Sequence, residues 1–358
     1  MLPKIISFYL PQYHPIPEND DWWGKGFTEW TNVAKAKPLF KGHDQPFLPS
    51  DLGFYDLRVP EVREEQAQLA KEAGIYGFAY WHYWFGNGKR ILERPLKEVL
   101  ISKKPDFPFC IAWANESWNG RWHGLDSKIL IEQLFPGHQD YIDYFQDCLP
   151  YFQDDRYIKV KDKLLFLIYR PLLIPDANKF IDLWRELGLR QGIEFYFVGI
   201  GSEECIKSGF DAFVNTGPII PDKVRFKTLF EKGIYLLTGQ SLKQLINSRT
   251  PEVYQYENVV KSVLNRPLHK QEFPLVIPNW DNTPRAGIKG LVLQNSSPDL
   301  YGKYLSKAIN LVSVKEQKIV FIKSWNEWAE GNTLEPSQIW GSAYLETTKK
   351  IISENSHE

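Results

Sequence analysis

Eight short apolar runs recur along the chain, and each has the composition of a strand that is buried on both faces. They lie at residues 5–10, 76–81, 108–114, 164–169, 194–200, 211–215, 274–278 and 318–324. Segments with the periodicity of amphipathic helices lie between several of them, at residues 60–73, 137–149, 176–187, 254–264 and 301–314. The first of these helices has a proline in its first turn and stops at Gly74, which is typical of helix ends.

Alternating strands and helices predict parallel pairing through right-handed crossovers. Eight such units predict a (β/α)8 TIM barrel with long loops at its C-terminal face, and a doubly wound sheet is the alternative. We expect one catalytic domain over residues 1–345, with an elaborated connection at about 219–272 and a C-terminal tail at 346–358.

Composition excludes several classes of protein. The formal charge is −1, from 43 Lys and Arg against 44 Asp and Glu, which argues against a nucleic-acid binder that works by bulk charge. Three scattered cysteines indicate neither a disulfide framework nor a zinc site. No run approaches the roughly 20 apolar residues of a membrane span, and the first ten residues lack signal-peptide features. We therefore expect a cytoplasmic protein without a membrane span.

The chain holds 13 tryptophans, and nearly all of them follow the carboxyl end of a predicted strand. Active sites of (β/α)8 barrels are built from the loops at that end. Aromatic rings with polar neighbours suit sugars, which are apolar on one face and carry hydroxyls at the edge; packing of the loop layer is the alternative. The set comprises Trp22, Trp23, Trp30, Trp81, Trp84, Trp113, Trp118, Trp122, Trp280, Trp325 and Trp328, with Trp340 farther along the last loop.

Glu327 and Glu330 directly follow the last predicted strand, three residues apart. In a helical turn this spacing brings Cβ atoms to roughly 5–6 Å. Retaining glycoside hydrolysis uses carboxyl groups about 5–5.5 Å apart, against roughly 6.5–9.5 Å for inverting chemistry. Flanking rings and an ionised neighbour can keep one carboxyl protonated. The alternative is a solvated pair that caps a loop.

Other polar side chains fall at the same predicted mouth. Glu116 could reach a glycosidic oxygen or form an ion pair with nearby Arg121 or Arg90, whereas Glu29 is expected to bind a hydroxyl. His14, His43, His82 and His123 lack metal-binding spacing, so we expect hydroxyl contacts, no metal and no cofactor. No nucleotide-binding fingerprint occurs. The expected substrate-binding set is Tyr9, Glu29, Trp30, Tyr80, His82, Trp84, Trp113, Asn115, Glu116, Trp118, Trp280, Trp325 and Asn326.

Several motifs together resemble the WbsX-like family of bacterial O-antigen and capsule loci. That family is usually labelled a glycosyltransferase and is also described as glycoside hydrolase family 99-like. The resemblance covers roughly residues 4 to 340. It is carried by residues 8–15 (FYLPQYHP), 26–30 (GFTEW), 45–46 (QP), 52–56 (LGFYD), 77–85 (GFAYWHYWF), 113–116 (WANE) and 325–331 (WNEWAEG).

The resemblance to family 99 implies a metal-independent (β/α)8 barrel that cleaves α-mannosides. It implies Glu330 as the general acid/base, and Glu327 as the base that helps the sugar 2-hydroxyl attack its own anomeric carbon, giving retention. Ala329 stands where family 99 has His, so substrate contacts and mannose specificity are not carried over.

The main hypothesis is therefore a retaining glycoside hydrolase of surface-polysaccharide metabolism, with an oligo- or polysaccharide as its substrate and with endo or exo action left open. A glycosyltransferase that uses the same cleft is the first alternative. A non-catalytic glycan-binding protein is the second.

Overall fold

The computed structural model describes residues 3–120, 129–216, 225, 228–246 and 250–355. Trp122 and His123, which we expected at the mouth of the barrel, lie outside these ranges. Within them, no helix has both the length and the apolar character needed to cross a bilayer.

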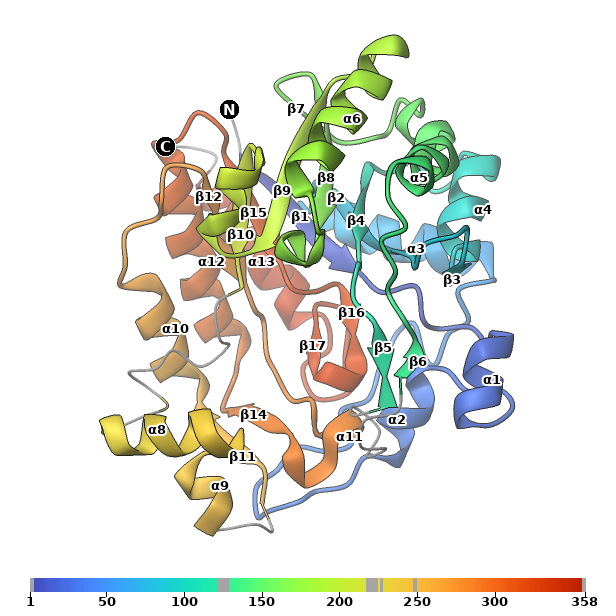
Figure 1. The fold of residues 1–358 in the computed structure, drawn as a ribbon. Helices are drawn as coiled ribbons and strands as arrows, with labels where there is room; N and C mark the ends of the chain where they lie inside the picture. Colours follow the sequence, from blue (N-terminus) through green and yellow to red (C-terminus); the bar gives the residue numbers. More distant parts are fainter. Residues whose placement is uncertain (1–2, 121–128, 217–224, 226–227, 247–249, 356–358) are drawn as a thin grey trace.

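Parallel strands form a nearly closed ring, and Figure 1 labels them along the chain. In order they are β1 (Lys4–Tyr9), β2 (Gly77–Trp84), β4 (Phe109–Trp113), β8 (Lys163–Ile168), β9 (Phe195–Gly201), β10 (Ala212–Asn215), β12 (Glu272–Phe273) with β13 (Leu275–Val276), and β15 (Ile319–Ile322). β10 pairs with β12 and β13 pairs with β15, so the seventh strand is split at Pro274 and completes the circuit back to β1. The predicted (β/α)8 barrel is confirmed.

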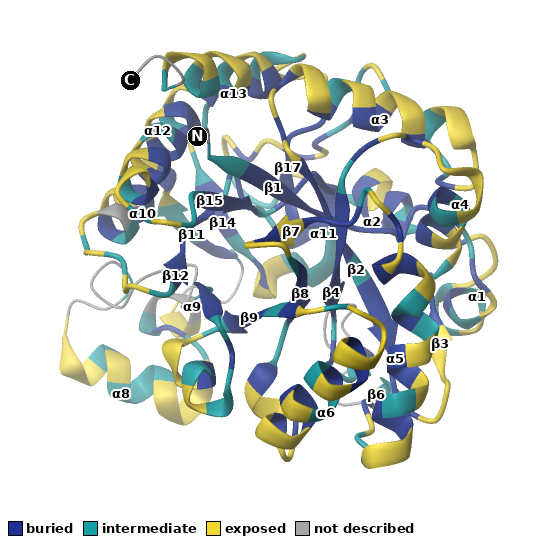
Figure 2. Cartoon of the chain, turned by 90° about the horizontal axis from the view of Figure 1, so that it is seen from above, coloured by how far each residue is buried: buried dark blue, intermediate teal, exposed yellow. Residues whose placement is uncertain are grey.

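Helices cover the outside of the barrel, with apolar faces inward and exposed faces outward (Figure 2). They include α3 (Pro60–Glu72), α4 (Arg94–Ser102), α5 (His138–Phe152), α6 (Ala177–Arg190), α10 (Tyr256–Leu264), α12 (Pro298–Ser313) and α13 (Ala343–Glu354). Most of the predicted C-terminal tail is α13, a helix that buries Tyr344, Leu345 and Thr348 and contacts α12 and α3. Residues 346–354 therefore belong to the helix layer of the barrel.

Two connections carry extra structure. The loop after β1 holds α1 (Pro17–Trp23) and α2 (Glu29–Lys35). The expected elaborated connection contains α8 (Leu229–Thr238), α9 (Leu242–Ile246) and β11 (Glu252–Gln255) before α10. β11 pairs in parallel with β14 (Leu291–Gln294), outside the barrel. Short pairs finish other loops: β3 (Arg90–Ile91), β5 (Trp118–Asn119) with β6 (Ile129–Ile131), β7 (Lys159–Val160), and β16 (Asn326–Glu327) with β17 (Asn332–Thr333).

Barrel strands are buried on both faces, and successive side chains point alternately into the barrel and toward the helices. Phe8 stacks on Trp81 and on Phe321 of β15, at ring distances of 4.8 and 5.6 Å, and these rings fill the interior. The neighbouring Tyr9 instead donates to Gln66 of α3, on the outside. This alternation decides which side chains reach the mouth of the barrel.

Candidate active site

A cavity of about 200 Å³ lies at the carboxyl ends of the barrel strands. The end of β2 and the loops that follow β1, β4, β8, β13 and β15 contribute to its wall, as expected for a (β/α)8 site. Its lining includes Leu10, Gln12, Trp23, Glu29, Trp81, Tyr83, Ala114, Glu116, Ser117, Trp118, Asn119, Leu130, Tyr169, Arg285, Lys323, Glu327 and Glu330.

Glu327 and Glu330 are brought together by one tight turn. Glu327 ends β16, and Glu330 ends the 3₁₀ turn Trp328–Glu330 that follows it. Positions three apart eclipse one another in a 3₁₀ turn, so both side chains project to the same side. Their carboxyl groups lie within hydrogen-bonding reach of each other. The expected pairing of the two carboxyls is therefore present, in a 3₁₀ rather than an α-helical turn.

The turn is held by buried hydrogen bonds. The Asn326 side chain accepts from the backbone N–H of Leu10 at 2.8 Å and donates to the Leu10 carbonyl at 3.0 Å. The backbone N–H of Glu327 donates to the Ser324 hydroxyl at 3.1 Å. Gly331 closes the turn with a φ of +58°, a conformation that favours glycine. The two carboxyl groups are thus fixed to the end of β1 as well as to β15.

Two cations flank Glu330. Arg285, in α11 (Thr283–Ala286), donates to one carboxyl oxygen at 2.6 Å, and Lys323 lies 3.4 Å from the other. Burial opposes ionisation of Glu330, but the charges of Lys323 and Arg285 outweigh it and lower its pKa. Glu330 is therefore held as a carboxylate.

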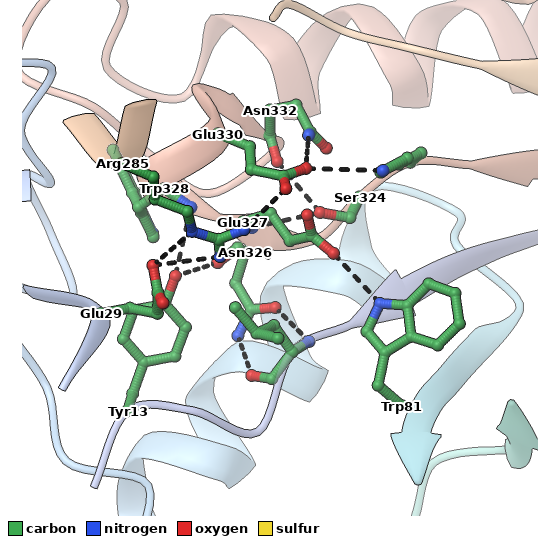
Figure 3. Close-up of polar contacts among 12 residues, drawn as sticks. Tyr13, Glu29, Trp81, Arg285, Ser324, Asn326, Glu327, Trp328, Glu330 and Asn332 are labelled. Carbon is green, nitrogen blue, oxygen red and sulfur yellow. Dashed lines mark hydrogen bonds and ion pairs between the residues drawn. The ribbon is translucent and has the colours of Figure 1, made fainter. Parts of the chain in front are cut away.

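Arg285 also pairs with Glu29 of α2, at 3.1 Å, and so bridges two carboxyl groups (Figure 3). Burial alone would lower the pKa of Arg285, but the charges of Glu29 and Glu330 raise it. The same balance holds for Lys323, where Glu330 and then Glu327 outweigh burial and raise the pKa. Both cations stay charged at the base of the cavity.

Glu327 lies in a different environment. Its Oε1 accepts from the indole N–H of Trp81 at 3.1 Å, as Figure 3 shows. Burial raises the pKa of Glu327, and the neighbouring charge of Glu330 raises it further. With Glu327 protonated, the carboxylates of Glu29 and Glu330 balance Arg285 and Lys323. The cavity floor then carries one acid and one base at no net charge.

Aromatic rings form much of the wall above the carboxyl pair. Tyr169 meets Trp81 edge to face, at a ring distance of 5.5 Å. Trp118 lies across the cavity, with its ring 5.2 Å from that of Tyr83 and 6.0 Å from that of Trp22. Rings in this arrangement offer apolar faces beside polar groups.

Glu116 lies at the rim, where it forms a half-exposed ion pair with Arg170 at 3.3 Å. Arg170 also lies over the ring of Tyr169, 4.4 Å from its centre. Glu116 therefore forms an ion pair, but with Arg170; the expected partner Arg90 pairs with Asp147 instead, and Arg121 lies outside the described residues.

Five residues of the expected site set line the cavity: Glu29, Glu116, Trp118, Glu327 and Glu330. Five others, all on barrel strands or at their ends, point outward to the helix layer. Tyr9 donates to Gln66, Tyr80 packs on Tyr9 and Phe109, His82 contacts the Tyr144 hydroxyl, Trp84 donates to Asp140, and Trp113 donates to the Trp84 carbonyl. They do not line the cavity, because each occupies the outward register of its strand.

The remaining expected residues are buried in the loop layer. Trp30 donates to the Tyr55 carbonyl, Asn115 bonds both backbone groups of Arg170, and Asn326 ties Leu10 as described. Trp325 is fully buried, and Trp280 carries Lys323 Nζ over its ring at 4.7 Å. These residues shape the loops and do not contact the cavity themselves.

His14, His43 and His82 are buried and do not line the cavity either. His43 pairs with Asp281 at 2.7 Å, and burial lowers the pKa of His82 to about 4. His14 is buried, and burial lowers its pKa too. Among the residues placed by the structure, no group of three His, Cys, Asp or Glu is arranged to hold a metal ion.

The expected set left out other side chains of the cavity, and four of them show why. Trp81 belonged to the tryptophan set but not to the expected site, and Tyr83 lies beyond the predicted end of the second strand. Lys323 could have been found, since it is the lone charge at the end of the last predicted strand. Arg285 lies in a short helix of four residues, for which periodicity gives no signal.

Comparison with known proteins gives consistent results. The family described as "Glycosyltransferase WbsX" matches residues 5–348. The "Uncharacterized protein WxcX" of Xanthomonas campestris pv. campestris (strain B100) is 37% identical over 360 residues, covering 98% of this chain and 49% of that protein. The counterpart from strain ATCC 33913 is also 37% identical over the same shares. The chain thus spans about half the length of the curated relatives it matches.

Solved structures share the fold at low identity. A GH99 endo-alpha-mannosidase from Bacteroides thetaiotaomicron aligns with a TM-score of 0.59 and 18% identity, over 99% of this chain and 97% of that one. A "Glycoside hydrolase-like protein" aligns with a TM-score of 0.60 and 14% identity, over 98% and 94%. At such identities the likeness shows the barrel fold.

Proposed function

The chain belongs to the glycosyltransferase WbsX family, and from that premise we propose that it is a carbohydrate-active enzyme that cleaves a glycan by a retaining glycosidase-type reaction. The observation that carries the proposal is the buried Glu327–Glu330 pair, in which Arg285 and Lys323 contact Glu330 and lower its pKa while burial raises the pKa of Glu327. Glycosidic cleavage needs both forms at once, an acid for the departing oxygen and a base for the attacking one.

The spacing of the pair supports retention. Inverting enzymes keep their carboxyl groups roughly 6.5–9.5 Å apart to leave room for a water molecule. Glu327 and Glu330 lie within hydrogen-bonding reach of each other, which leaves no such room. The substrate then passes through an intermediate before water completes the reaction.

The walls support a sugar substrate. Trp81, Trp118 and Tyr169 present rings around the carboxyl pair, and Glu29 and Arg285 offer polar atoms at the base. We propose the rings as stacking surfaces for sugars and the Glu29–Arg285 pair as a contact for hydroxyl groups. One protein with the same fold is named as a GH99 endo-alpha-mannosidase, so this barrel is compatible with an endo-acting glycosidase.

The test is incubation with the producing organism's surface polysaccharide and its lipid-linked precursors, read by mass spectrometry. We expect fragments from the wild type and none from Glu330→Gln or Glu327→Gln. Glu316→Gln is the matched control, because Glu316 pairs with Lys161 at the surface. This variant should cleave the glycan like the wild type. Cleavage by Glu330→Gln at the wild-type rate would overturn the proposal.

The family description favours a second candidate, a glycosyltransferase that uses the same cavity. It predicts no fragments, and addition of sugar when nucleotide-activated donors are supplied. If the protein neither cleaves the glycan nor transfers a sugar, and both Gln variants still bind the glycan, the protein is a non-catalytic glycan-binding protein.

A further inference from the structure

Helix α8 turns an apolar side to solvent. Leu229, Phe230, Leu236 and Leu237 are between 71 and 89% exposed, and Ile246 of the neighbouring α9 is 77% exposed. Leu229 and Leu236 are two turns apart in α8, as are Phe230 and Leu237, so the four side chains share one side of the helix. None of the ten residues of α8, all of which the structure describes, is buried, and Figure 2 draws the helix without the buried colour. A helix of a globular protein normally packs such a side against the core.

Polar contacts hold the other side of α8 in place. The Arg225 guanidinium lies over the ring of Tyr235, 4.8 Å from its centre, and pairs with Glu252 of β11 at 3.0 Å. β11 pairs with β14, and Leu293 of β14 donates to the carbonyl of Trp280, which follows β13. α8 is therefore attached to the loops at the carboxyl end of the barrel, where Figure 1 draws it at the same end as β14 and α11.

The segment that contains α8 is basic. Residues 223–249 hold six Lys and Arg and one acidic residue, Glu231, in a chain whose formal charge is −1. Within α8, Lys232 is exposed and lies three and four residues from Leu229 and Leu236, so it borders the apolar side. An exposed apolar side that is bordered by cations is typical of helices that lie in the plane of a membrane surface.

The apolar side of α8 is too small to hold a second copy of the chain. A stable dimer buries roughly 800 Å² on each partner, from about 20–30 residues. The exposed apolar side chains of α8 and α9 supply a small part of that area. A bilayer needs no matching surface, because each apolar side chain enters the headgroup region separately while cations contact the anionic headgroups. Size and charge together favour a lipid surface over a protein partner.

We propose that α8 docks on the surface of an anionic lipid bilayer, with its four apolar side chains in the headgroup region and Lys232 against the headgroups. The inference goes beyond the proposed function and does not depend on the Glu327–Glu330 pair. Because α8 and the cavity lie at the same end of the barrel, docking holds the mouth of the cavity near the membrane. Glycans carried by a lipid then gain access to the cavity, and this consequence alone rests on the proposed function.

The test is sedimentation of the full chain with vesicles of phosphatidylcholine, either alone or mixed in equal parts with phosphatidylglycerol. We expect binding to the mixed vesicles that weakens as salt rises, because salt screens the attraction between cations and headgroups. The double variant Phe230→Ser, Leu237→Ser should partition onto these vesicles about tenfold more weakly or less, since it removes two apolar side chains from the docked surface. Both side chains are exposed, so its Tm should match that of the wild type.

The matched control is the double variant Leu189→Ser, Val314→Ser. These side chains are 66 and 90% exposed. They lie at the C-terminal ends of α6 and α12, which lead into β9 and β15 from the opposite face of the barrel. This variant also loses two exposed apolar side chains, but it should bind the mixed vesicles like the wild type.

A dye on α8 reports whether the helix enters the bilayer. The three native cysteines are buried, so an environment-sensitive thiol dye labels the exposed new site in Leu237→Cys or, as its control, in Val314→Cys. On mixed vesicles we expect a blue shift of the emission for the label on α8 and none for the label after α12.

The inference is wrong if the protein binds neither kind of vesicle, if binding ignores both salt and phosphatidylglycerol, if the two double variants bind equally, or if the dye on α8 shows no shift. A wild-type dimer that forms without lipid and dissociates in the α8 variant, measured by sedimentation velocity, would also overturn it, because a second copy would then cover the helix. Glycan cleavage without vesicle binding would refute the docking alone, and vesicle binding without cleavage would refute the proposed function alone.

Discussion

Replacing Arg285 by Met should destabilise the protein in a way that depends on pH. Arg285 is buried and bridges Glu29 and Glu330, at 3.1 and 2.6 Å. Methionine fills similar space but leaves two buried carboxylates without their shared cation. Removing one partner of a buried ion pair typically costs about 3–5 kcal/mol.

The size of the effect on thermal unfolding follows from the chain length. Unfolding entropy is about 2.1 cal/mol/K per residue, which over 358 residues gives roughly 0.75 kcal/mol/K. A loss of about 3–5 kcal/mol at the transition temperature therefore lowers Tm by about 4–7 °C.

The pH dependence has a definite sign. In the wild type the cations lower the pKa of Glu330, so its contribution to stability is present above the unfolded pKa and is lost as pH falls. Without Arg285 the native carboxyls bind protons more readily than in the unfolded chain, so the variant loses stability as pH rises. The deficit should be small near pH 4.5 and full near pH 7.5.

Differential scanning calorimetry of wild type and variant at several pH values measures this. Arg170→Met is the matched control, because Arg170 also lies near the cavity but its pair with Glu116 is half exposed. Exposed pairs contribute about 0–1 kcal/mol, so Tm should fall by about 1 °C at most. A deficit in Arg285→Met that matches the control, or that does not change with pH, would refute the account of a buried charge cluster.

Three further outcomes are expected. Burial raises the pKa of Glu335 to about 7, so the free energy of unfolding falls as pH rises toward 7. In Glu335→Gln the difference in free energy of unfolding between pH 5 and pH 8, measured with urea, should be smaller by about 3 kcal/mol. Burial lowers the pKa of His82 to about 4, so stability is lost as pH falls below about 6.5, and His82→Gln should flatten that acid limb. Gly331→Ala should lower Tm more than Gly88→Ala: both glycines have positive φ, but a Cβ at Gly331 would lie 2.8 Å from the backbone nitrogen of Asp281, whereas Gly88 has open space. Equal losses of Tm at the two glycines would contradict the steric argument.

The barrel and the carboxyl pair could be predicted because both leave a local signal. Apolar runs separated by amphipathic helices predict a parallel barrel, and all eight predicted runs contain barrel strands. Glu327 and Glu330 follow the last strand in sequence, and the carboxyl ends of all barrel strands lie at one face of the barrel, where the site is built. Nothing beyond the order of elements was needed to bring them to the mouth.

The inward or outward register of each strand could not be predicted. Parallel strands in a barrel are apolar on both faces, so the sequence lacks the alternation that marks the exposed side of an antiparallel strand. In β2 the expected Tyr80, His82 and Trp84 point outward, whereas Trp81 and Tyr83 between them reach the cavity. Arg285 was missed for another reason, since α11 is too short for a periodic pattern.

The turn from Asn326 to Glu330 has one more consequence. It carries both proposed reacting groups within five consecutive residues, whereas the walls of the cavity come from other loops. The two carboxyl groups therefore share one turn, whereas Arg285 and Glu29, which contribute to their charge environment, and most of the wall come from other segments. Loops after β1, β2 and β4 can change in length or sequence, through divergence or by grafting from a relative, and alter which glycan is accepted. The turn Asn326–Glu330 would keep its place through changes that preserve Leu10, Glu29 and Arg285, which makes this barrel a suitable starting point for engineering new linkage preferences.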